Sequence, residues 1–525
     1  MMKTTMKQYS FASQLKSLAV VFSIALTFAS CAKEDVAQNP TNTEGDNDKN
    51  LTTFVAGDEA KTRTSLDYNS SDFSWEAGDY IYVKDDDGVL QKSSNAPTQK
   101  VASFRYRVPG KFGASANYKV YYLGKNSNGS QVTISANQTQ TAPDNTEHFG
   151  TAGDYGTATA TGAVGGSIFS FQLEHQPAYL VFQPYTSNTI LQNCYLTKIE
   201  VTSDNDIAET YTVNTSTGAL TGSAGSKQIV LTTSGRDSYS NGFPLSNSSA
   251  SVTTNGAYMV IKPGTHTLRV RYWVKDVATH VEGTISKNLP ATVYASNTYY
   301  DMTANLNVRN YDGDKYCMWD AQEQYWKGHE WDLGGSQPTL LSQSASSDYP
   351  QNSSDTNNRW YNESYPGYGV SNPATHTLCK DLPNINEMTW YAAAGDPRWD
   401  GDELWTIMGH LYKGGMWFKK KANISGFNPN TAYDGSDWRT YGNNHGYSIS
   451  YTLPDAADAG NYFYLPALGN YQFGQLVNVF RGAIYWSSSA YPWDSKDAYD
   501  LYLDNTGIYV GFFPRYMGFR AEAFQ

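Results

Sequence analysis

The sequence predicts a mainly β protein with two β-sandwiches followed by an α+β domain. Its 525 residues are too many for one hydrophobic core and indicate several domains. From residue 51 to about residue 307, short segments with alternating apolar and polar positions follow one another, which is typical of strands. Eleven of the thirteen tryptophans lie from Trp319 onward, so the C-terminal part is chemically different from the rest.

The first thirty residues have the pattern of a secretion signal. Lys3, Lys7 and Lys16 precede an apolar run at residues 18–29, which is long enough for a signal peptide and too short to span a bilayer. We therefore expect residues 1–30 to direct export and to contribute nothing to the fold.

A cysteine stands where this signal would be cleaved. The segment Phe28-Ala29-Ser30-Cys31 resembles the lipobox of bacterial lipoproteins, which implies that Cys31 is acylated and held in the lipid of the outer membrane. Each buried methylene adds about 0.8 kcal/mol, so several acyl chains on one residue would anchor the protein durably. The alternative is an ordinary secretory signal in which the cysteine occurs by chance.

Polar residues follow the cysteine. Lys33, Glu34 and Asp35 resemble the short acidic signal that sends lipoproteins of the Bacteroidota to the cell surface, although a solvated charge cluster is the simpler alternative. Residues 36–50 have almost no apolar side chains and cannot offset the entropy lost on ordering. Residues 31–50 are therefore expected to form a lipidated, flexible tether.

Composition argues against nucleic acid and zinc as ligands. The chain has 38 Lys and Arg against 50 Asp and Glu, and the resulting charge of −12 repels phosphate backbones. After Cys31 only Cys194, Cys317 and Cys379 remain, without a CxxC motif or a Cys/His cluster. We expect no cofactor and no metal; Cys317 and Cys379 could pair, and one thiol would be left over.

Two sandwiches fit the length of the strand-rich region, one over residues 51–187 and one over residues 188–310. Tyr80 and Tyr82 alternate with Ile81 and Val83, which indicates a half-buried strand, and a turn is expected at residues 87–88. The carboxylates of residues 85–87 could attract calcium, but the spacing of an EF-hand is absent.

Several motifs in this region resemble the fimbrillin family. They are KTRTSL at residues 61–66, FSWEAGDYIYV at 73–83, FSFQLEHQPAYLVFQ at 169–183 and IEVTS at 199–203. The resemblance implies transthyretin-like sandwiches and surface pili whose subunits exchange strands after cleavage at an arginine. Arg63 lies where such cleavage would occur, although an exposed arginine on a first strand explains it equally well. Because over two hundred residues follow the sandwiches, a pilus tip or a stand-alone adhesin is favoured over a repeated shaft subunit.

Residues 311–525 are expected to form the α+β domain. Helices are predicted at residues 386–394, ended by Gly395, and at residues 402–411, capped by Asp402. Strands are predicted at the following segments: 462–468, 483–489, 497–504 and 507–513, the last two forming a hairpin across residues 505–507.

The order of these segments over residues 382–524 resembles the C-terminal domains of Bacteroidota surface proteins related to the major paralogous domain family. A helix with tryptophan, a strand ending in Leu-Pro-Ala, a Tyr-Trp-Ser-Ser strand, a hairpin and a Gly-Phe-Arg strand occur in that order. The resemblance implies a C-type-lectin-like fold of the formylglycine-generating-enzyme kind. That enzyme's activity is not implied, because no cysteine follows Cys379 to supply its copper chemistry.

We expect no enzymatic activity. His410 and His445 have no companions at ligand spacing, and neither a nucleophile elbow nor a phosphate-binding glycine loop occurs. Four carboxylate pairs could flank a sugar, but solvated surface is the simpler explanation for each. The pairs are Asp400 with Asp402, Asp434 with Asp437, Asp494 with Asp497, and Asp500 with Asp504.

Aromatic residues near the C-terminus are the candidate ligand contacts. Most tryptophans, such as Trp390, Trp417 and Trp486, are expected to fill the core, whereas rings in turns or at outward positions cannot all be buried by the last hairpin. Exposed Tyr and Trp contact ligands at low entropic cost. The predicted site consists of Tyr471, Phe473, Tyr491, Trp493, Asp494, Tyr509, Phe513 and Tyr516.

These observations predict a lipid-anchored adhesin at the cell surface that binds an extracellular glycan or protein through its C-terminal domain. The first alternative is a pilus tip or accessory subunit with a structural role, for which other pilus subunits would be the partners. The second is a surface enzyme that degrades glycans.

Overall fold

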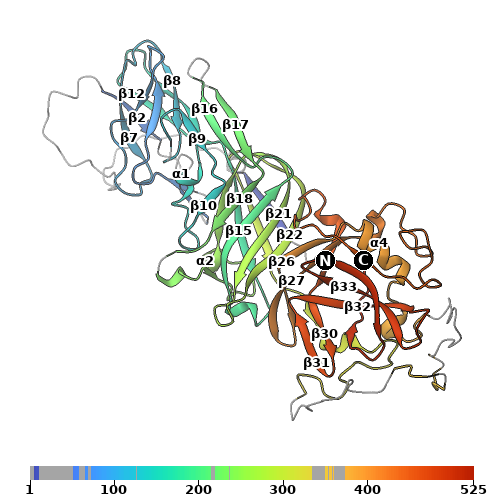
Figure 1. The fold of residues 1–525 in the computed structure, drawn as a ribbon. Coiled ribbons are helices and arrows are strands. Elements are labelled where there is room, and N and C mark those ends of the chain that lie inside the picture. Colours follow the sequence, from blue (N-terminus) through green and yellow to red (C-terminus); the bar gives the residue numbers. More distant parts are fainter. Residues whose placement is uncertain are drawn as a thin grey trace, which may run out of the picture. The chain divides into compact units, whose positions relative to one another are not determined.

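The protein is described here by a computed structural model that covers residues 5–10, 51–57, 65–68, 72–125, 127–214, 219–235, 237–333, 349–352, 354–357, 359 and 373–525. The chain divides into two compact units (Figure 1). Unit 1 contains Met1–Val277 and Lys287–Asn307, and unit 2 contains Ala278–Ser286 and Val308–Gln525.

Unit 1 begins with a mainly antiparallel sheet around an aromatic core. Its strand order is β6 (Leu90–Lys92), β5 (Ile81–Lys84), β8 (Asn117–Tyr122), β11 (Gly156–Gly162), β12 (Ile168–Phe171), β2 (Leu51–Ala56) and β7 (Phe104–Pro109), with β12 and β2 parallel. The indole of Trp75 is fully buried and meets the rings of Tyr106 and Tyr122 edge to face. The expected half-buried strand at Tyr82 is wrong, because Tyr82 is buried along with Ile81 and Val83.

The acidic turn at residues 85–88 is confirmed, and its carboxylates hold the surrounding loops. Asp85 accepts hydrogen bonds from the backbone of Asp87 and Val89 and from the Gln91 amide. Asp86 accepts from the Tyr118 hydroxyl and from the backbone of residues 113 and 114. The acidic residues of this turn therefore have a structural role in holding the loops.

The rest of unit 1 is built on two further sheets. One has the order β1 (Thr5–Ser10), β23 (Thr298–Asn305), β14 (Ala178–Tyr185) and β20 (Ala257–Ile261). The other contains β10 (Asn137–Thr139), β18 (Gln228–Thr232), β15 (Tyr195–Ser203), β21 (Gly264–Lys275) and residues 287–294 of β22 (Glu282–Tyr294). Strand β14 precedes the expected boundary at residue 187 but pairs with β20 and β23, which follow it.

Smaller elements complete unit 1, and some of its short strands form a three-stranded and a two-stranded sheet of their own. The strands are β3 (Ser65–Asp67), β4 (Asp72–Ser74), β9 (Gln131–Thr133), β13 (Glu174–His175), β16 (Ala208–Val213), β17 (Leu220–Ser226) and β19 (Phe243–Pro244), and the helices are α1 (Phe149–Ala152) and α2 (Val252–Asn255).

The N-terminal residues contribute one strand, contrary to the expectation that residues 1–30 add nothing to the fold. Strand β1 pairs antiparallel with β23 from Thr5 opposite Thr303 to Ser10 opposite Thr298. An edge strand such as β23 presents a row of backbone groups that an extended segment of almost any sequence can satisfy. The paired segment therefore needs no strand-like sequence of its own.

Unit 2 has one main sheet covered by a helix. The sheet order is β25 (Tyr316–Cys317), β35 (Phe519–Arg520), β32 (Gly482–Ala490), β33 (Asp497–Asp504), β34 (Ile508–Pro514) and β28 (His445–Tyr447). The helix α4 (Ile385–Ala394) confirms the first helix prediction, and Asn384 and Glu387 form a capping box at its start. The predicted strands and the final hairpin are also confirmed.

The second predicted helix, at residues 402–411, is wrong. This segment belongs to the hairpin of β26 (Arg398–Ile407) and β27 (His410–Lys419), and β29 (Tyr462–Pro466) pairs with β27. Met408 and Gly409 both have positive φ angles, 48° and 74°, as a two-residue hairpin turn requires. Trp405 and Ile407 are buried on one face of β26, so tertiary packing outweighs the local helical pattern.

Shorter elements complete unit 2. They are β24 (Asn310–Tyr311), α3 (Thr377–Lys380), β30 (Leu468–Gln472) and β31 (Gln475–Val479), the last two forming a hairpin.

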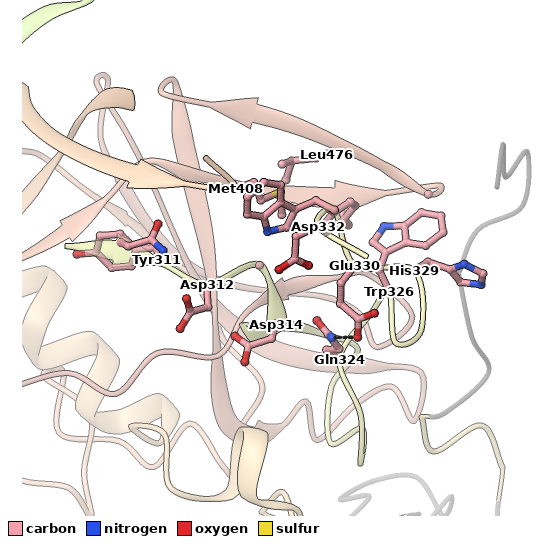
Figure 2. Close-up of a pocket in the computed structure, with 15 residues that line it drawn as sticks. Tyr311, Asp312, Asp314, Gln324, Trp326, His329, Glu330, Asp332, Met408 and Leu476 are labelled. Carbon is pink, nitrogen blue, oxygen red and sulfur yellow. Dashed lines mark hydrogen bonds between the residues drawn. The ribbon is translucent and has the colours of Figure 1, made fainter. Parts of the chain in front are cut away.

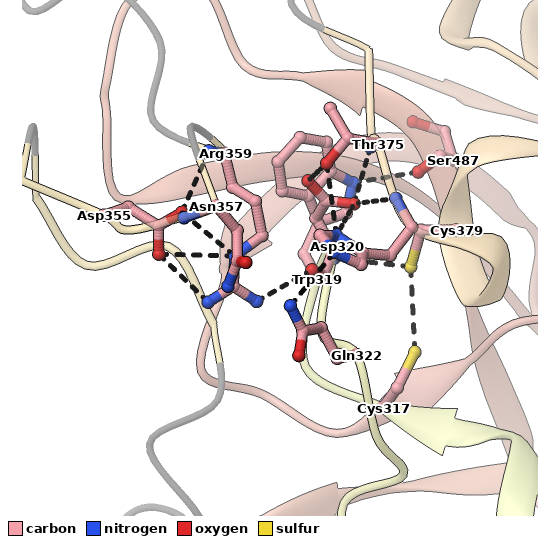
Figure 3. Close-up of polar contacts among 11 residues, drawn as sticks. Cys317, Trp319, Asp320, Gln322, Asp355, Asn357, Arg359, Thr375, Cys379 and Ser487 are labelled. Atoms are coloured by element: carbon pink, nitrogen blue, oxygen red, sulfur yellow. Dashed lines mark hydrogen bonds and ion pairs between the residues drawn. The ribbon is translucent and has the colours of Figure 1, made fainter.

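A buried polar network holds three segments of unit 2 together (Figure 3). The carboxylate of Asp320 accepts hydrogen bonds from the backbone of Thr375 and His376, and Arg359 donates to the Asp320 carbonyl while pairing with Asp355. Two buried cysteines, Cys317 and Cys379, lie beside it with their sulfur atoms 3.7 Å apart.

Candidate ligand-binding surface

The candidate surface forms around a loop that α4 holds in place. The side-chain amide of Asn386 donates to the Asp437 carboxylate and its oxygen accepts from the backbone of Trp438. Trp438 is buried and its indole donates to Asp434. Burial would raise the pKa of Asp437, but hydrogen bonds from Arg439 and Asn386 lower it below its usual value. The next residues, 441–446, are thereby fixed at the surface beside the terminal hairpin.

Three exposed rings surround this loop: Tyr441 (63% exposed), Trp493 (41%) and Tyr509 (44%). We call them the aromatic surface. Tyr441 and Trp493 meet edge to face with ring centroids 5.5 Å apart. The hydroxyl of Tyr509 donates to the side chain of Asn444, 3.0 Å away. Large rings that stay in water without being needed in the core are typical of ligand contacts.

Two glycines in the loop let these rings approach its backbone. A Cβ atom on Gly442 would lie 3.0 Å from the Tyr491 ring and 3.1 Å from the Trp493 indole. A Cβ atom on Gly446 would lie 3.0 Å from the Tyr509 ring, and Gly446 pairs with Tyr509 across β28 and β34. Trp493 and Tyr509 are thus joined through one short loop. Both belong to the predicted site.

Of the seven rings predicted to be exposed, four are exposed, two (Tyr471 and Tyr516) are half-buried, and one is buried. Phe473, Trp493, Tyr509 and Phe513 are exposed, and Asp494 is exposed as well. Tyr491 is only 8% exposed, because its ring stacks on Phe512 at 3.8 Å and packs on Tyr499. A ring that packs on residues of both hairpin strands becomes part of the core, even though the sequence around it is typical of a turn. The roles of the predicted site residues in ligand binding stay predictions.

The other predicted residues make their contacts outside the aromatic surface. Tyr471 is half-buried and stacks on Tyr325 at 4.9 Å. Phe473 occupies the β30–β31 turn with a φ angle of 50°, and Phe513 packs on Phe519. Tyr516 is half-buried against the core of unit 2.

Sequence reasoning missed Tyr441. The predicted rings all lie between residues 471 and 516, whereas Tyr441 lies on a connection before β28. The sequence carries one signal that could have found it, because Tyr441 is followed at once by Gly442 and then by two asparagines, a combination typical of exposed loops.

The candidate carboxylates serve as local structural groups. Asp400 accepts from the Trp417 indole, Asp434 from Trp438 and Ser436, and Asp504 from the backbone of Thr506. The expectation of solvated surface is wrong for Asp400 and Asp500, which are 3% and 1% exposed. Burial, followed by repulsion from Asp497, raises the pKa of Asp500 well above its usual value.

Metal-ligating groups do not gather in the described part of the chain. No set of three or more His, Cys, Asp or Glu side chains lies close enough to hold an ion among the residues that the structure describes. His445 packs on the ring of Tyr447, and His410 lies beside Tyr412.

The predicted anchoring and processing residues cannot be placed. Cys31, Lys33, Glu34, Asp35 and Arg63 all lie outside the described residues. Within the described ranges, none of the helices has the length and apolar character needed to cross a bilayer.

No family model and no curated protein matches the chain. Among solved structures, it is similar to a "putative cell adhesion protein" from Bacteroides ovatus, with 14% identity and a TM-score of 0.30 over 48% of this chain and 91% of the other. The fimbrial anchor protein Mfa2 from Porphyromonas gingivalis matches with 12% identity and a TM-score of 0.21, over 46% and 83% of the two chains. A fimbrial protein from Bacteroides ovatus matches with 11% identity and a TM-score of 0.23, over 89% and 98%. Likenesses of this degree assign neither fold family nor role to this chain.

Proposed function

We propose that the protein is a cell-surface adhesin that binds an extracellular glycan or protein through the aromatic surface of unit 2. The observation that carries this proposal is the cluster of Tyr441, Trp493 and Tyr509, three large rings that remain 41–63% exposed around one loop. Rigid rings with polar tips lose little entropy on binding and stack on sugar faces or enter protein grooves.

Polar side chains border these rings. Asn444 and His445 are exposed on the loop itself, and Asp494 follows Trp493 directly. Asn, Asp and His supply the hydrogen bonds that orient a hydroxyl-rich ligand over an aromatic platform. The surrounding residues therefore suit a shallow, non-covalent contact, and the C-type-lectin-like fold that the sequence motifs imply is part of this proposal.

The proposal also includes anchoring of the protein through an acylated Cys31. Export would follow the signal of Lys33, Glu34 and Asp35, and residues 31–50 would form a tether. The support is the lipobox-like sequence and its position after an apolar run. Metabolic labelling with an alkyne fatty acid tests it, with Cys31→Ser as the control. Label on the native chain and none on the variant supports anchoring; label on neither contradicts it.

The ligand is sought with the full chain on a printed glycan array and on wells coated with mucin, collagen or fibronectin. We expect retention on at least one probe and loss of that retention in the Trp493→Ala/Tyr509→Ala double variant, with no product released from the probe. Release of product would favour the glycan-degrading alternative. Retention that survives the double substitution would place the contact elsewhere.

The structure offers one observation in favour of a pilus subunit. Strand β1 pairs with one edge of β23 along six residue pairs. If Cys31 becomes the mature N-terminus, β1 leaves with the signal and the β23 edge is open to a strand from another chain. The edge is open both with a start at Cys31 and after cleavage at Arg63, so mass spectrometry of the mature N-terminus separates the two functions by the lipid: a start at Cys31 keeps the anchor and favours the anchored adhesin, and cleavage after Arg63 removes it and favours assembly.

A further inference from the structure

Unit 2 contains a cavity of about 700 Å³ that is distinct from the aromatic surface (Figure 2). It lies between residues 310–314, residues 324–332, the turn at Met408 and the β30–β31 hairpin. Of the residues predicted from sequence to bind a ligand, only Tyr471 lines it. Its volume is in the range of pockets that take small organic molecules.

Aromatic rings form two of its walls. Trp326 packs on Tyr471 with ring centroids 6.2 Å apart, and Tyr325 supports Tyr471 from behind in a stacked arrangement. The indole of Trp331 lies over the hairpin turn, since a Cβ atom on Gly409 would be 3.2 Å from it, and the ring is still 53% exposed. The turn between β26 and β27 thus positions an indole at the cavity.

Four carboxylates border the same space. They belong to Asp312, Asp314, Glu330 and Asp332, all of which line the cavity, and Figure 2 shows the Glu330 carboxylate against the Gln324 side chain. Glu330 is held by the Gln324 amide and the backbone of Gly328, and hydrogen bonds to backbone groups lower its pKa, so it is ionised at neutral pH.

Few basic side chains lie near these carboxylates in the part of the chain that the structure describes. No lysine or arginine is among the described residues that line the cavity. Arg309 and Arg520 both pair with Glu522, and Lys315 points to the same carboxylate at 4.0 Å. Lys327, which is exposed, acts on Glu330, and His329 lines the cavity. Arg309 and Arg520 lie over the ring of Tyr311, but their carboxylate partner is Glu522, outside the lining.

The arrangement suits an organic cation better than a metal ion. A bound metal requires three or more ligands within about 2.6 Å of one point, which the described carboxylates do not provide. They are instead spread around a cavity that also offers indole faces. A cation on an alkyl stem matches both features, because its charge meets carboxylates while its stem and charge lie over aromatic rings.

We propose that this cavity binds an alkylammonium or guanidinium group, from a free diamine or from the basic side chain of a peptide. This site is independent of the aromatic surface, so either can fail without the other. Free amines and peptide side chains present the same chemistry, and the experiment distinguishes them.

Isothermal titration of the full chain is carried out with cadaverine and with Nα-acetyl-lysine methylamide. Pentanol, which has a similar stem without charge, and glutarate, an anion of similar length, are the comparison probes. We expect one or both amines to bind and neither comparison probe to do so. Binding of cadaverine alone identifies a free amine as the ligand, and binding of the lysine derivative identifies a peptide side chain.

The charge and ring contributions are tested with matched variants. Asp314→Asn/Asp332→Asn should weaken amine binding at least tenfold, and Trp331→Ala at least fivefold, because each removes a direct contact. Asp381→Asn/Asp455→Asn changes the net charge equally at two exposed positions outside the cavity and should leave the affinity unchanged. Circular dichroism confirms folding, and Asp332→Asn alone replaces the double variant if that variant unfolds.

The proposal would be overturned by the absence of amine binding at millimolar concentration, by equal weakening by Asp381→Asn/Asp455→Asn, or by binding of pentanol as tight as that of the amines. Displacement of the amine by an equal concentration of calcium would also overturn it, since it would indicate a metal site. Trp493→Ala should not change the amine affinity, which separates this test from that of the proposed function.

Discussion

The rings of Tyr441 and Trp493 meet edge to face, 5.5 Å apart, although 52 positions separate them in the sequence and both remain largely in water. The contact depends on Gly442, because a side chain there would enter the space of the Trp493 indole. The absence of a side chain at Gly442 therefore allows the Trp493 ring to lie where it does.

The substitution Gly442→Ala should reduce ligand retention without removing any ring. The added Cβ atom would lie 3.1 Å from the Trp493 indole and force it to move. A shift in tryptophan fluorescence together with weaker retention on the probe found by the array is the expected result. Gly460→Ala is the matched control, because a Cβ atom there meets nothing within 4 Å. Equal effects of the two substitutions would contradict this account.

Loss of the helix cap of α4 should destabilise unit 2. The Asn384 side chain accepts from the backbone of Glu387, and the Glu387 carboxylate accepts from the backbone of Asn384. Asn384→Ala removes one bond of this capping box, at a cost of about 1 kcal/mol in the free energy of unfolding. Urea denaturation checks this value, and Asn384→Asp, which keeps the acceptor, should restore most of the stability. An unchanged midpoint for Asn384→Ala would mean that the cap contributes nothing.

The stability of unit 2 should depend on Asp497 above pH 4. Burial, and then repulsion from Asp494, raises the pKa of Asp497 from 3.8 to about 6. The folded state therefore holds the proton more tightly than the unfolded state, so this group stabilises the fold at low pH and the contribution is lost as pH rises from about 4 to about 6.

Asp497→Asn removes this effect and should stabilise the protein at pH 7.5, on the order of 1 kcal/mol after allowance for solvent screening, with little change at pH 4. Thermal unfolding at the two pH values measures the difference, and Asp455→Asn, at an exposed position, is the control. A greater gain at pH 4 than at pH 7.5 would reverse the sign and refute the assignment.

The thiol of Cys379 should be unreactive in the folded protein. Burial, followed by the neighbouring Cys317, raises its pKa well above the usual value, so little thiolate is present at pH 8. In protein kept reduced, labelling with a maleimide should be slow in buffer and fast in urea, as followed by mass spectrometry. Rapid labelling of Cys379 in buffer would show that its surroundings open easily.

Local sequence signals predicted the elements whose ends are marked by nearby residues. The conformation of the other segments depends on long-range packing. Gly395 marks the end of α4 in the sequence, and the predicted bounds of the helix agree with the structure within one residue. Leu404, Ile407 and Leu411 follow helical spacing, and only their burial against the neighbouring strands selects the hairpin.

The candidate site shows the same division. The exposure of Trp493 and Tyr509 follows from their positions near turns, whereas the burial of Tyr491 depends on Phe512 of β34. Tyr441 joins the surface through a contact with a residue 52 positions away. The four carboxylates of the cavity come from two segments that the sequence gives no reason to combine.

The central claim is that the aromatic surface binds the ligand, and a matched pair of single substitutions tests it most directly. Trp493 and Phe480 are both exposed, 41% and 52%, but Phe480 lies between β31 and β32, away from the loop at residues 441–446. Dissociation constants are measured by biolayer interferometry on the probe that retains the native chain. We predict at least a tenfold loss of affinity for Trp493→Ala, which is about 1.4 kcal/mol, and none for Phe480→Ala. Equal affinities of Trp493→Ala and the native protein would contradict the claim.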